Sequence, residues 1–528
     1  MRARTNAAWL VGTLFLAGCP SGQTCATGYA VGADGRCAPS DAGGAGDAGN
    51  QPCSAGTWDD DGDPRTACVA WRNCTAGEHI AHEGTTMSDR DCAPCGSGTF
   101  SAEPNAAACE SWGTCALGDV EDQPGSPTHD RTCVGTPWTR QFGSTLSDYA
   151  YGTMVDASGN TYVVGYTLGV MPGQTAAGSE DAFIRKYAAD GTELWTRQFG
   201  TAEDDGIYAL AIEAGGDVYV AGYTYGSLPG QASSGGEDVF VRRYAPDGME
   251  RWTRQFGTTG LDEAAALAVD PSGNVYVGGT TSGTLPGQSS AGTGDAFVRR
   301  YTADGSEGWT QQFGSTGLDR VNALSLFDRE LYASGYTRDT LPGQSSSGAD
   351  DAFVRAFTLE GTASWTQQFG TAGLDTVLAS AADSTGVYVA GYVDGALPGQ
   401  TSAGAIDAFV RRYASNGSEL WTRQFGTTGV DGISAAAVAG GSVFVTGNVA
   451  DALPGQSSFG SADAFVRSYG AGGTEMWSHQ FGTSAGDQGF GVALDASGRV
   501  YVGGITLGVF DGQTGIGAID VFVTRIVR

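Results

Sequence analysis

The chain is 528 residues long, which is enough for several domains or for one large array of repeats. It carries 58 acidic and 28 basic side chains, a net charge of −30, and 85 residues are glycine. This excess of negative charge disfavours nucleic acid as a partner, because phosphates would be repelled. All eleven cysteines precede residue 134, which separates a cysteine-rich N-terminal part from a cysteine-free remainder.

The first residues have the features of an export signal. A positively charged start is followed by an apolar run at 7–17, which is too short to be a permanent membrane helix. The run ends in Leu16-Ala17-Gly18-Cys19, which resembles the lipobox of bacterial lipoproteins. The resemblance implies a signal peptide at 1–18 and acylation of Cys19, whereas an ordinary secretory signal is the alternative. Proline at position 20, where some inner-membrane lipoproteins have aspartate, favours the outer membrane.

Residues 19–52 are expected to form a lipidated, flexible tether. The stretch 40–51 (SDAGGAGDAGNQ) is too poor in apolar side chains to form a core. Cys25 and Cys37 could close one small loop within this tether. We therefore expect an exported protein held to the bacterial cell envelope through its lipid, with exposure at the cell surface as one arrangement.

Residues 53–92 and 93–133 are two copies of one four-cysteine module, because their second and third cysteine gaps are identical in length. Segment 68–92 resembles the cysteine-rich modules of tumour-necrosis-factor receptors, although many of those modules have six cysteines. Following this resemblance, we expect the bridges Cys53–Cys68, Cys74–Cys92, Cys95–Cys109 and Cys115–Cys133. Each would stabilise its module by about 3 kcal/mol in the chain-entropy model. The modules serve either as a stiff spacer or as a protein-binding stalk, and a zinc site around His79 and His82 is a weaker alternative.

Seven tryptophans reveal the organisation of the rest of the chain. Trp138, Trp195, Trp252, Trp309, Trp365, Trp421 and Trp477 lie 57, 57, 57, 56, 56 and 56 residues apart. Each begins a hexapeptide that ends in Gln-Phe-Gly. One structural unit is therefore copied seven times and buries its core against its neighbours. We interpret these tryptophans as core residues between units; sugar-binding platforms are the alternative.

Each unit contains four strand patterns, which in the second copy fall at 207–213, 217–224, 238–244 and 250–256. Four strands in each of seven units predict an all-β, seven-bladed β-propeller at 138–528. The array begins with a Trp strand and ends just where another would follow. We therefore expect 138–142 to pair with the C-terminal strand and complete the last blade. The motifs also resemble the seven-bladed-propeller repeats of bacterial extracellular proteins, a resemblance that implies the fold but no activity.

The longer connections of the units should emerge together on one face of the propeller. An aspartate follows Gln-Phe-Gly by five residues in every unit: Asp148, Asp205, Asp262, Asp319, Asp375, Asp431 and Asp487. A second circle of aspartates, beginning with Asp181, starts the third strands. The functional interpretation is a negatively charged face that takes a cationic ligand or Ca²⁺; capping of the backbone is the alternative. No other cofactor is expected.

The sequence favours a binding protein over an enzyme. The candidate groups repeat seven times, and no nucleophile elbow, HExxH or phosphate loop is present. Blade-specific departures, such as Arg320, 327–330 and 338–339, are where an unrecognised propeller enzyme of lyase or hydrolase type would have its site. We expect a monomeric, lipid-anchored recognition or adhesion protein whose propeller face binds a repetitive polysaccharide or a surface protein. An envelope scaffold is the alternative.

Overall fold

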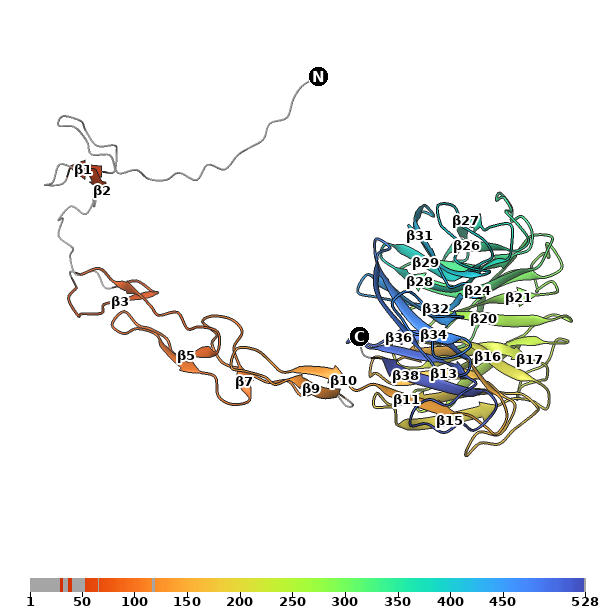
Figure 1. Ribbon diagram of the computed structural model, residues 1–528, viewed down its shortest axis with the longest axis horizontal. Coiled ribbons are helices and arrows are strands. Elements are labelled where there is room, and N and C mark those ends of the chain that lie inside the picture. The colour runs from red at the N-terminus through yellow and green to blue at the C-terminus, as the bar shows by residue number, and fades with distance from the viewer. Residues whose placement is uncertain (1–28, 32–36, 40–52, 65, 116–118, 527–528) are drawn as a thin grey trace, which may run out of the picture. The chain divides into compact units, whose positions relative to one another are not determined.

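The computed structural model describes residues 29–31, 37–39, 53–64, 66–115 and 119–526 (Figure 1). The expected signal peptide, Cys19 and Cys25 lie outside these residues. The chain divides into two compact units. The first contains the described residues up to Thr114 and residues 122–132, and the second contains the described residues of 115–121 and residues 133–526. None of the described residues forms a helix long and apolar enough to cross a membrane.

The cysteine-rich modules consist of short two-stranded sheets. The paired strands are β3 (Thr57–Trp58) with β4 (Val69–Ala70), β5 (Glu78–His82) with β6 (Asp91–Pro94), β7 (Thr99–Phe100) with β8 (Glu110–Ser111) and β9 (Asp119–Gln123) with β10 (Thr132–Gly135). Before the modules, β1 (Tyr29–Val31) pairs with β2 (Cys37–Pro39). Such short strands bury little apolar surface, so the modules depend on crosslinks. The bridges are Cys53–Cys68, Cys74–Cys92, Cys95–Cys109 and Cys115–Cys133, as the sequence analysis expected.

A repeated Asp-Arg pair shapes both modules. The carboxylate of Asp89 accepts a hydrogen bond from the backbone of Arg72 at 2.6 Å, and the guanidinium of Arg90 lies 5.4 Å from the Trp71 ring. Asp130 and the neighbouring arginine make the same contacts with Gly113 and Trp112 in the second module. The groups at His79, Cys95 and Cys109 lie close together, but both cysteines belong to a disulfide and cannot be zinc ligands.

The second unit contains seven four-stranded antiparallel sheets (Figure 1). Blade 1 contains β12 (Asp148–Val155), β13 (Thr161–Thr167), β14 (Asp181–Tyr187) and β15 (Glu193–Phe199). Blade 2 contains β16 (Asp205–Ile212), β17 (Val218–Thr224), β18 (Asp238–Tyr244) and β19 (Glu250–Phe256). Blade 3 contains β20 (Asp262–Val269), β21 (Val275–Thr281), β22 (Asp295–Tyr301) and β23 (Glu307–Phe313). Blade 4 contains β24 (Asp319–Phe327), β25 (Glu330–Thr337), β26 (Asp351–Thr358) and β27 (Ala363–Phe369). Blade 5 contains β28 (Asp375–Asp383), β29 (Gly386–Val393), β30 (Asp407–Tyr413) and β31 (Glu419–Phe425). Blade 6 contains β32 (Gly432–Ala439), β33 (Ser442–Val449), β34 (Asp463–Gly470) and β35 (Glu475–Phe481). Blade 7 is β36 (Asp487–Leu494), β37 (Val500–Thr506), β38 (Asp520–Ile526) and β11 (Trp138–Phe142).

Blade 7 closes the ring in the expected way. Strand β11 pairs antiparallel with β38, in a register that runs from Trp138 opposite Arg525 to Phe142 opposite Val521. The seventh sheet therefore contains both ends of the array, and no blade is left with three strands. Closure of this kind removes the exposed sheet edges that an open array would leave.

The core consists of layers between adjacent blades. One layer joins Val241 of blade 2 to Phe297 of blade 3, and the outer-strand residues Trp252 and Phe256 pack against it. The indole nitrogen of Trp252 also donates a hydrogen bond to the carbonyl of Ala303, in a turn of the following blade, at 3.1 Å. The repeated tryptophans are thus interblade core residues, as the sequence analysis predicted.

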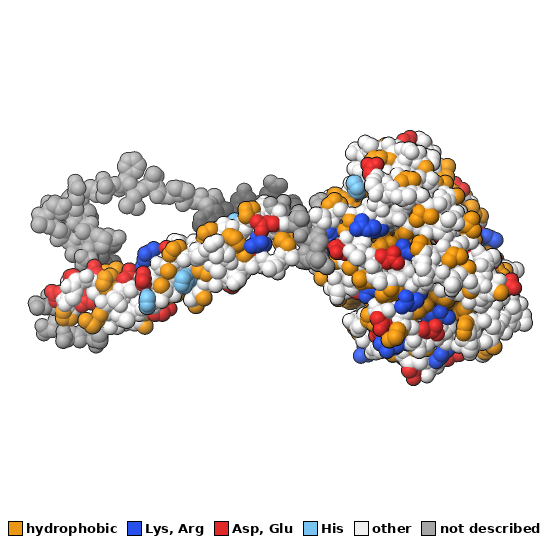
Figure 2. Space-filling model, turned by 90° about the horizontal axis from the view of Figure 1, so that it is seen from below, with side chains coloured by type: hydrophobic (Ala, Val, Ile, Leu, Met, Phe, Trp, Pro, Cys, Tyr) orange, Lys and Arg blue, Asp and Glu red, His pale blue; other side chains and the backbone are white. Residues whose placement is uncertain are grey.

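The repeated arginines of the third strands also join blades. Arg242 of β18 lies 3.9 Å from the centre of the Phe199 ring in the preceding blade, and its Nε donates to the Thr253 hydroxyl at 2.7 Å. Burial of this side chain is tolerated because the carboxylate of Glu250 lies 3.5 Å from the guanidinium. On the propeller surface shown in Figure 2, basic and acidic side chains are interspersed.

Candidate functional site: the mouth of the propeller channel

The first aspartate circle is buried. Its seven members, Asp148, Asp205, Asp262, Asp319, Asp375, Asp431 and Asp487, are only 0–2% exposed. Asp205 shows their common role, because its carboxylate accepts hydrogen bonds from the backbone nitrogen of Thr201 at 2.5 Å and from the Thr201 hydroxyl at 3.0 Å. This burial and these bonds agree with the capping interpretation of the first circle. The aspartates hold the loops between blades, although one carboxylate oxygen each of Asp148, Asp205, Asp262 and Asp487 is buried without a hydrogen-bond partner among the described residues.

The second circle also holds loops in place. Asp181 accepts hydrogen bonds from the backbone of Ala177 at 2.9 Å and from the Gln198 side chain at 2.8 Å. The side-chain oxygen of Gln198 accepts from the backbone of Met171 at 2.9 Å, so the loop before the third strand is fixed to the outer strand. Equivalent bonds recur around the ring, for example between Gln255 and Asp238 at 2.8 Å. The repeated aspartates and glutamines are thus structural.

A β-bulge interrupts the innermost strand of every blade at the same place. In the pairing of this strand with the second strand, one residue is skipped, and it is always the third residue after the buried aspartate. We call these residues the bulge positions: Tyr151, Tyr208, Ala265, Asn322, Leu378, Ser434 and Phe490. A bulge redirects a side chain from its strand. All seven bulge positions line one cavity of about 450 Å³ at the loop-side mouth of the central channel.

The residue directly after each buried aspartate lies two positions before a bulge position, and in three blades it lines the same cavity. We call these the rim positions: Tyr149, Gly206, Glu263, Arg320, Thr376, Gly432 and Gln488. Three of them, Glu263, Arg320 and Gln488, line the cavity together with the bulge positions. The rim and bulge positions differ in residue type from blade to blade, whereas the aspartate before them is the same in all seven blades and the residue after each bulge is alanine or glycine. Each blade therefore has a different combination of rim and bulge residues.

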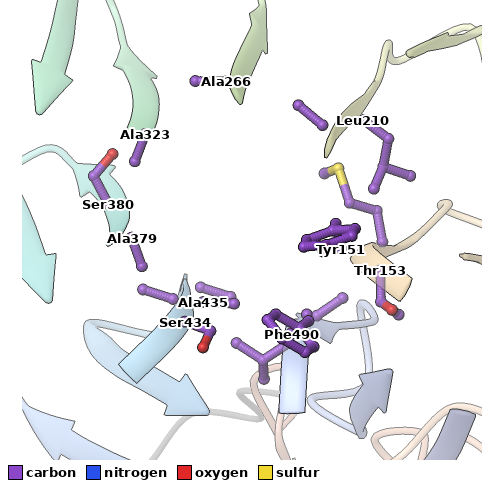
Figure 3. Close-up of a pocket in the computed structure, with 18 of the residues that line it drawn as sticks. Tyr151, Thr153, Leu210, Ala266, Ala323, Ala379, Ser380, Ser434, Ala435 and Phe490 are labelled. Carbon is purple, nitrogen blue, oxygen red and sulfur yellow. The ribbon is translucent and has the colours of Figure 1, made fainter. Parts of the chain in front are cut away.

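An aromatic wall forms one side of the mouth. The bulge positions of blades 7, 1 and 2 are Phe490, Tyr151 and Tyr208, and the centre of the Tyr151 ring lies 5.3 Å from that of Phe490 and 4.7 Å from that of Tyr208. Figure 3 shows Tyr151 and Phe490 side by side at the channel wall. Burial raises the pKa of Tyr151, so its hydroxyl stays protonated at neutral pH.

A polar wall lies on blades 3 and 4, next to the blade that carries Tyr208. The guanidinium of Arg320 binds both carboxylate oxygens of Glu263, at 2.6 and 2.7 Å. The amide nitrogen of Asn322 donates to the carbonyl of Val377 at 2.9 Å, whereas no described residue donates to its side-chain oxygen. Each charge in the cavity is thus paired, and an amide oxygen is left to accept a hydrogen bond.

Two further carboxylates lie behind the aromatic wall. Tyr223 donates its hydroxyl to Glu180, and Tyr225 donates to Glu237 at 3.1 Å. Burial, reinforced by the negative charge of Glu263, raises the pKa of Glu237 to about 7. The raised pKa leaves the Glu237 carboxyl partly protonated near neutral pH, so its negative charge is reduced there.

Beyond the bulge positions the side chains of the channel are mostly apolar. A cavity of about 400 Å³ extends from the bulge positions along them, and its further lining residues are mainly alanine, leucine, valine and glycine, with side-chain hydroxyls at Thr153 and Ser380 (Figure 3). Few side chains there could replace the hydrogen bonds to water that a ligand with many hydroxyl groups would lose. The channel can therefore accept such a ligand at its mouth but not along its length.

The blade-specific residues of the sequence analysis have different locations. Arg320 lies in the mouth, whereas Phe327 lies at the other end of the same strand, away from it. Arg338 pairs with Asp350 at 2.9 Å and is 56% exposed. The mouth tyrosines were not predicted, although comparing the seven repeats position by position would have found them.

The fold and this site define a class: a seven-bladed β-propeller of repeated blades, with a pocket at the mouth of its channel, preceded by disulfide-bonded modules. Comparisons with known proteins agree with this class. Residues 138–170, 251–286 and 477–511 match the β-propeller repeat family called SBBP, and residues 95–133 match the TNFR/NGFR cysteine-rich region. The chain thus carries SBBP repeats and a receptor-type cysteine-rich module.

Curated relatives share only part of their length with this chain. Regulatory protein FlaEY of Caulobacter vibrioides is 27% identical over 397 residues, which cover 66% of this chain and 42% of that protein. An uncharacterized WD repeat-containing protein of Acanthamoeba polyphaga mimivirus is 27% identical over 171 residues, which cover 27% of this chain and 12% of that protein. The chain therefore spans less than half of each relative, one of which is named a regulatory protein.

Solved structures with a similar fold include propellers of enzymes. The β-propeller domain of the Trilobed protease from Pyrococcus furiosus is 7% identical, with a TM-score of 0.39, and the match covers 68% of this chain and 89% of that one. A gluconolactonase from Xanthomonas campestris is 13% identical, with a TM-score of 0.34, over 72% of this chain and 88% of that one.

Proposed function

We propose that this protein is an exported recognition protein, tethered to the bacterial cell envelope by a lipid on Cys19, that binds an external ligand at the channel mouth. The observation that carries the proposal is the divergence of the rim and bulge positions. Copies that agree in their repeated tryptophan, glutamine and aspartate residues differ where they line the mouth. The differing residues form a pocket of a size typical for ligand sites.

The N-terminal part supports the same proposal. Four disulfides in the modules fit an oxidising compartment outside the cytoplasm. The composition of residues 40–51 suits a flexible tether, which would allow the modules and the propeller to reach away from the membrane. Outer-membrane attachment and display at the cell surface belong to this proposal.

Binding is favoured over catalysis because the mouth has no activated nucleophile. Glu263, the carboxylate among the residues that line the cavity, has both oxygens bound to Arg320, which disfavours a role as general base. The described part of the propeller contains a single histidine, His479, on an outer strand between the rings of Trp477 and Phe481. The mouth thus has hydrogen-bonding and stacking groups in place, which is sufficient for recognition.

The proposal is tested by measuring binding of the fluorescently labelled full chain to isolated bacterial envelopes and to their separated polysaccharide and protein fractions. We expect saturable binding that is lost in Tyr208→Ala. Phe459→Ala, which removes a 51%-exposed ring from a loop outside the pocket, is the matched control and should bind normally. Saturable binding that survives Tyr208→Ala and is lost in Phe459→Ala would show that the repeated loops, and not the mouth, form the site.

A further inference from the structure

Resting on the proposed recognition function, we infer that the mouth binds the end of an uncharged saccharide chain, with one sugar ring between the aromatic wall and the polar wall. The two walls differ in chemistry and line one cavity, with the aromatic residues on blades 7, 1 and 2 and the polar residues on blades 3 and 4. A pyranose has the same asymmetry, because its C–H groups gather on its faces and its hydroxyls project from its edge. The pocket therefore matches a sugar in shape and in polarity.

The aromatic wall supplies the surface for a sugar face. Tyr151 and Phe490 lie with their ring planes at 52°, and Tyr151 meets Tyr208 at 90°, so the three rings form a corner and not a flat platform. Aromatic rings give large apolar contact at little cost in side-chain entropy. A corner encloses one ring from two sides, which suits a single terminal residue better than the middle of a chain.

The polar wall supplies directional groups without net charge. The Arg320–Glu263 pair cancels its own charge, and Asn322 presents an amide oxygen. Gln488 and Ser434, which are hydrogen-bonded to each other at 3.5 Å, add neutral donors and acceptors at the aromatic side. A charged ligand would have to break the ion pair to find a partner, whereas hydroxyl groups can bond to it as it stands.

A charged sugar would have to replace an existing ion pair. An anionic residue would have to take Arg320 from Glu263, and a cationic residue would have to take Glu263 from Arg320. A neutral hexose leaves this pair intact.

The apolar lumen beyond the mouth makes the binding end-on. A saccharide chain that threaded through the channel would place its hydroxyls against alanine and leucine side chains. Only the terminal residue can therefore enter, and each protein chain should bind one saccharide end. In this scheme the seven repeated loops are not separate binding sites, so the protein does not bind its ligand multivalently.

The test is isothermal titration of the full chain with three sets of short oligosaccharides: neutral hexose, uronate-containing and glucosamine-containing. We expect one neutral oligosaccharide per chain and a loss of affinity of about tenfold or more in Tyr208→Ala, which corresponds to one lost ring contact. Ala265→Trp, which fills the cavity without removing a ring from the wall, should abolish binding even if Tyr208→Ala is unstable. Phe459→Ala should bind like the wild type.

Specificity variants separate the inference from the proposed function. Glu263→Gln leaves Arg320 unpaired and should shift binding toward uronate-containing chains, whereas Arg320→Gln should shift it toward glucosamine-containing chains. Preference of the wild type for a charged set, or several saccharides per chain, would overturn the inference while leaving recognition at the mouth intact. No saccharide binding, together with Tyr208-dependent binding to an envelope protein fraction, would also overturn the inference alone. Loss of that envelope binding in Phe459→Ala but not in Tyr208→Ala would overturn both.

Discussion

Ring closure by β11 can be tested with one substitution, Trp138→Ala. The Trp138 side chain is only 8% exposed, and its ring centre lies 6.2 Å from those of Tyr187 in blade 1 and Tyr501 in blade 7. Its indole nitrogen donates to the carbonyl of Ala189 at 3.1 Å. Removing such a residue costs about 3–5 kcal/mol, a large part of the roughly 5–15 kcal/mol that stabilises a typical domain.

The assay is thermal and denaturant unfolding of the full chain, followed by tryptophan fluorescence and circular dichroism. Trp309→Ala is the matched control, because Trp309 occupies the same strand position inside the array and donates to Leu359 at 2.8 Å. If the ring is closed, both variants should lower the midpoint of one main transition by similar amounts. A separate early transition in Trp138→Ala, with the main transition unmoved, would mean that blade 7 frays alone and would refute closure as the source of stability.

Two buried carboxylates give further predictions. Because the pKa of Glu237 is about 7 in the folded chain and 4.5 when unperturbed, the folded state binds more protons between these values, so this group's contribution to stability falls as pH rises from about 4.5 to 7. The loss is at most about 3 kcal/mol, and Glu237→Gln should flatten the dependence; an unchanged slope of unfolding free energy against pH would contradict this assignment. Asp205→Ala leaves the backbone nitrogen of Thr201 without its acceptor and should cost about 1–3 kcal/mol, equally with Ca²⁺ and with chelator. A Ca²⁺-dependent stabilisation of the wild type that disappears in Asp205→Ala would show that the circle does bind the ion.

Much of the propeller could be predicted because each blade repeats one local pattern. In blade 2 the expected third and fourth strands, 238–244 and 250–256, coincide with β18 and β19, and the first two differ by one or two residues at their ends. The phase of the Trp strands was sufficient to predict which two strands would pair last. Both inferences needed only spacing and alternation, which are written directly in the sequence.

Whether a polar side chain is buried or exposed was harder to predict. An aspartate at the end of a strand can face solvent or turn back to the preceding loop, and the sequence pattern is the same in both cases. Asp205 turns back because the loop after Gly200 presents an unpaired backbone nitrogen at Thr201. The bulges were also missed, since no residue type marks them: the seven bulge positions include alanine, asparagine, leucine, serine and aromatic residues.

The contrast between uniform and divergent positions follows from how a propeller is built. A partly buried residue such as Trp252 contacts the next blade, so a change in one copy must suit a neighbour that has not changed. Residues at the mouth also contact the next blade, as Tyr151 contacts Tyr208 and Arg320 binds Glu263, but each of these contacts occurs in only one pair of blades. Partial burial of the charges of Arg320 and Glu263 costs free energy that apolar side chains would not cost. That cost falls in the cavity to which we assign ligand binding, which supports the proposed recognition function.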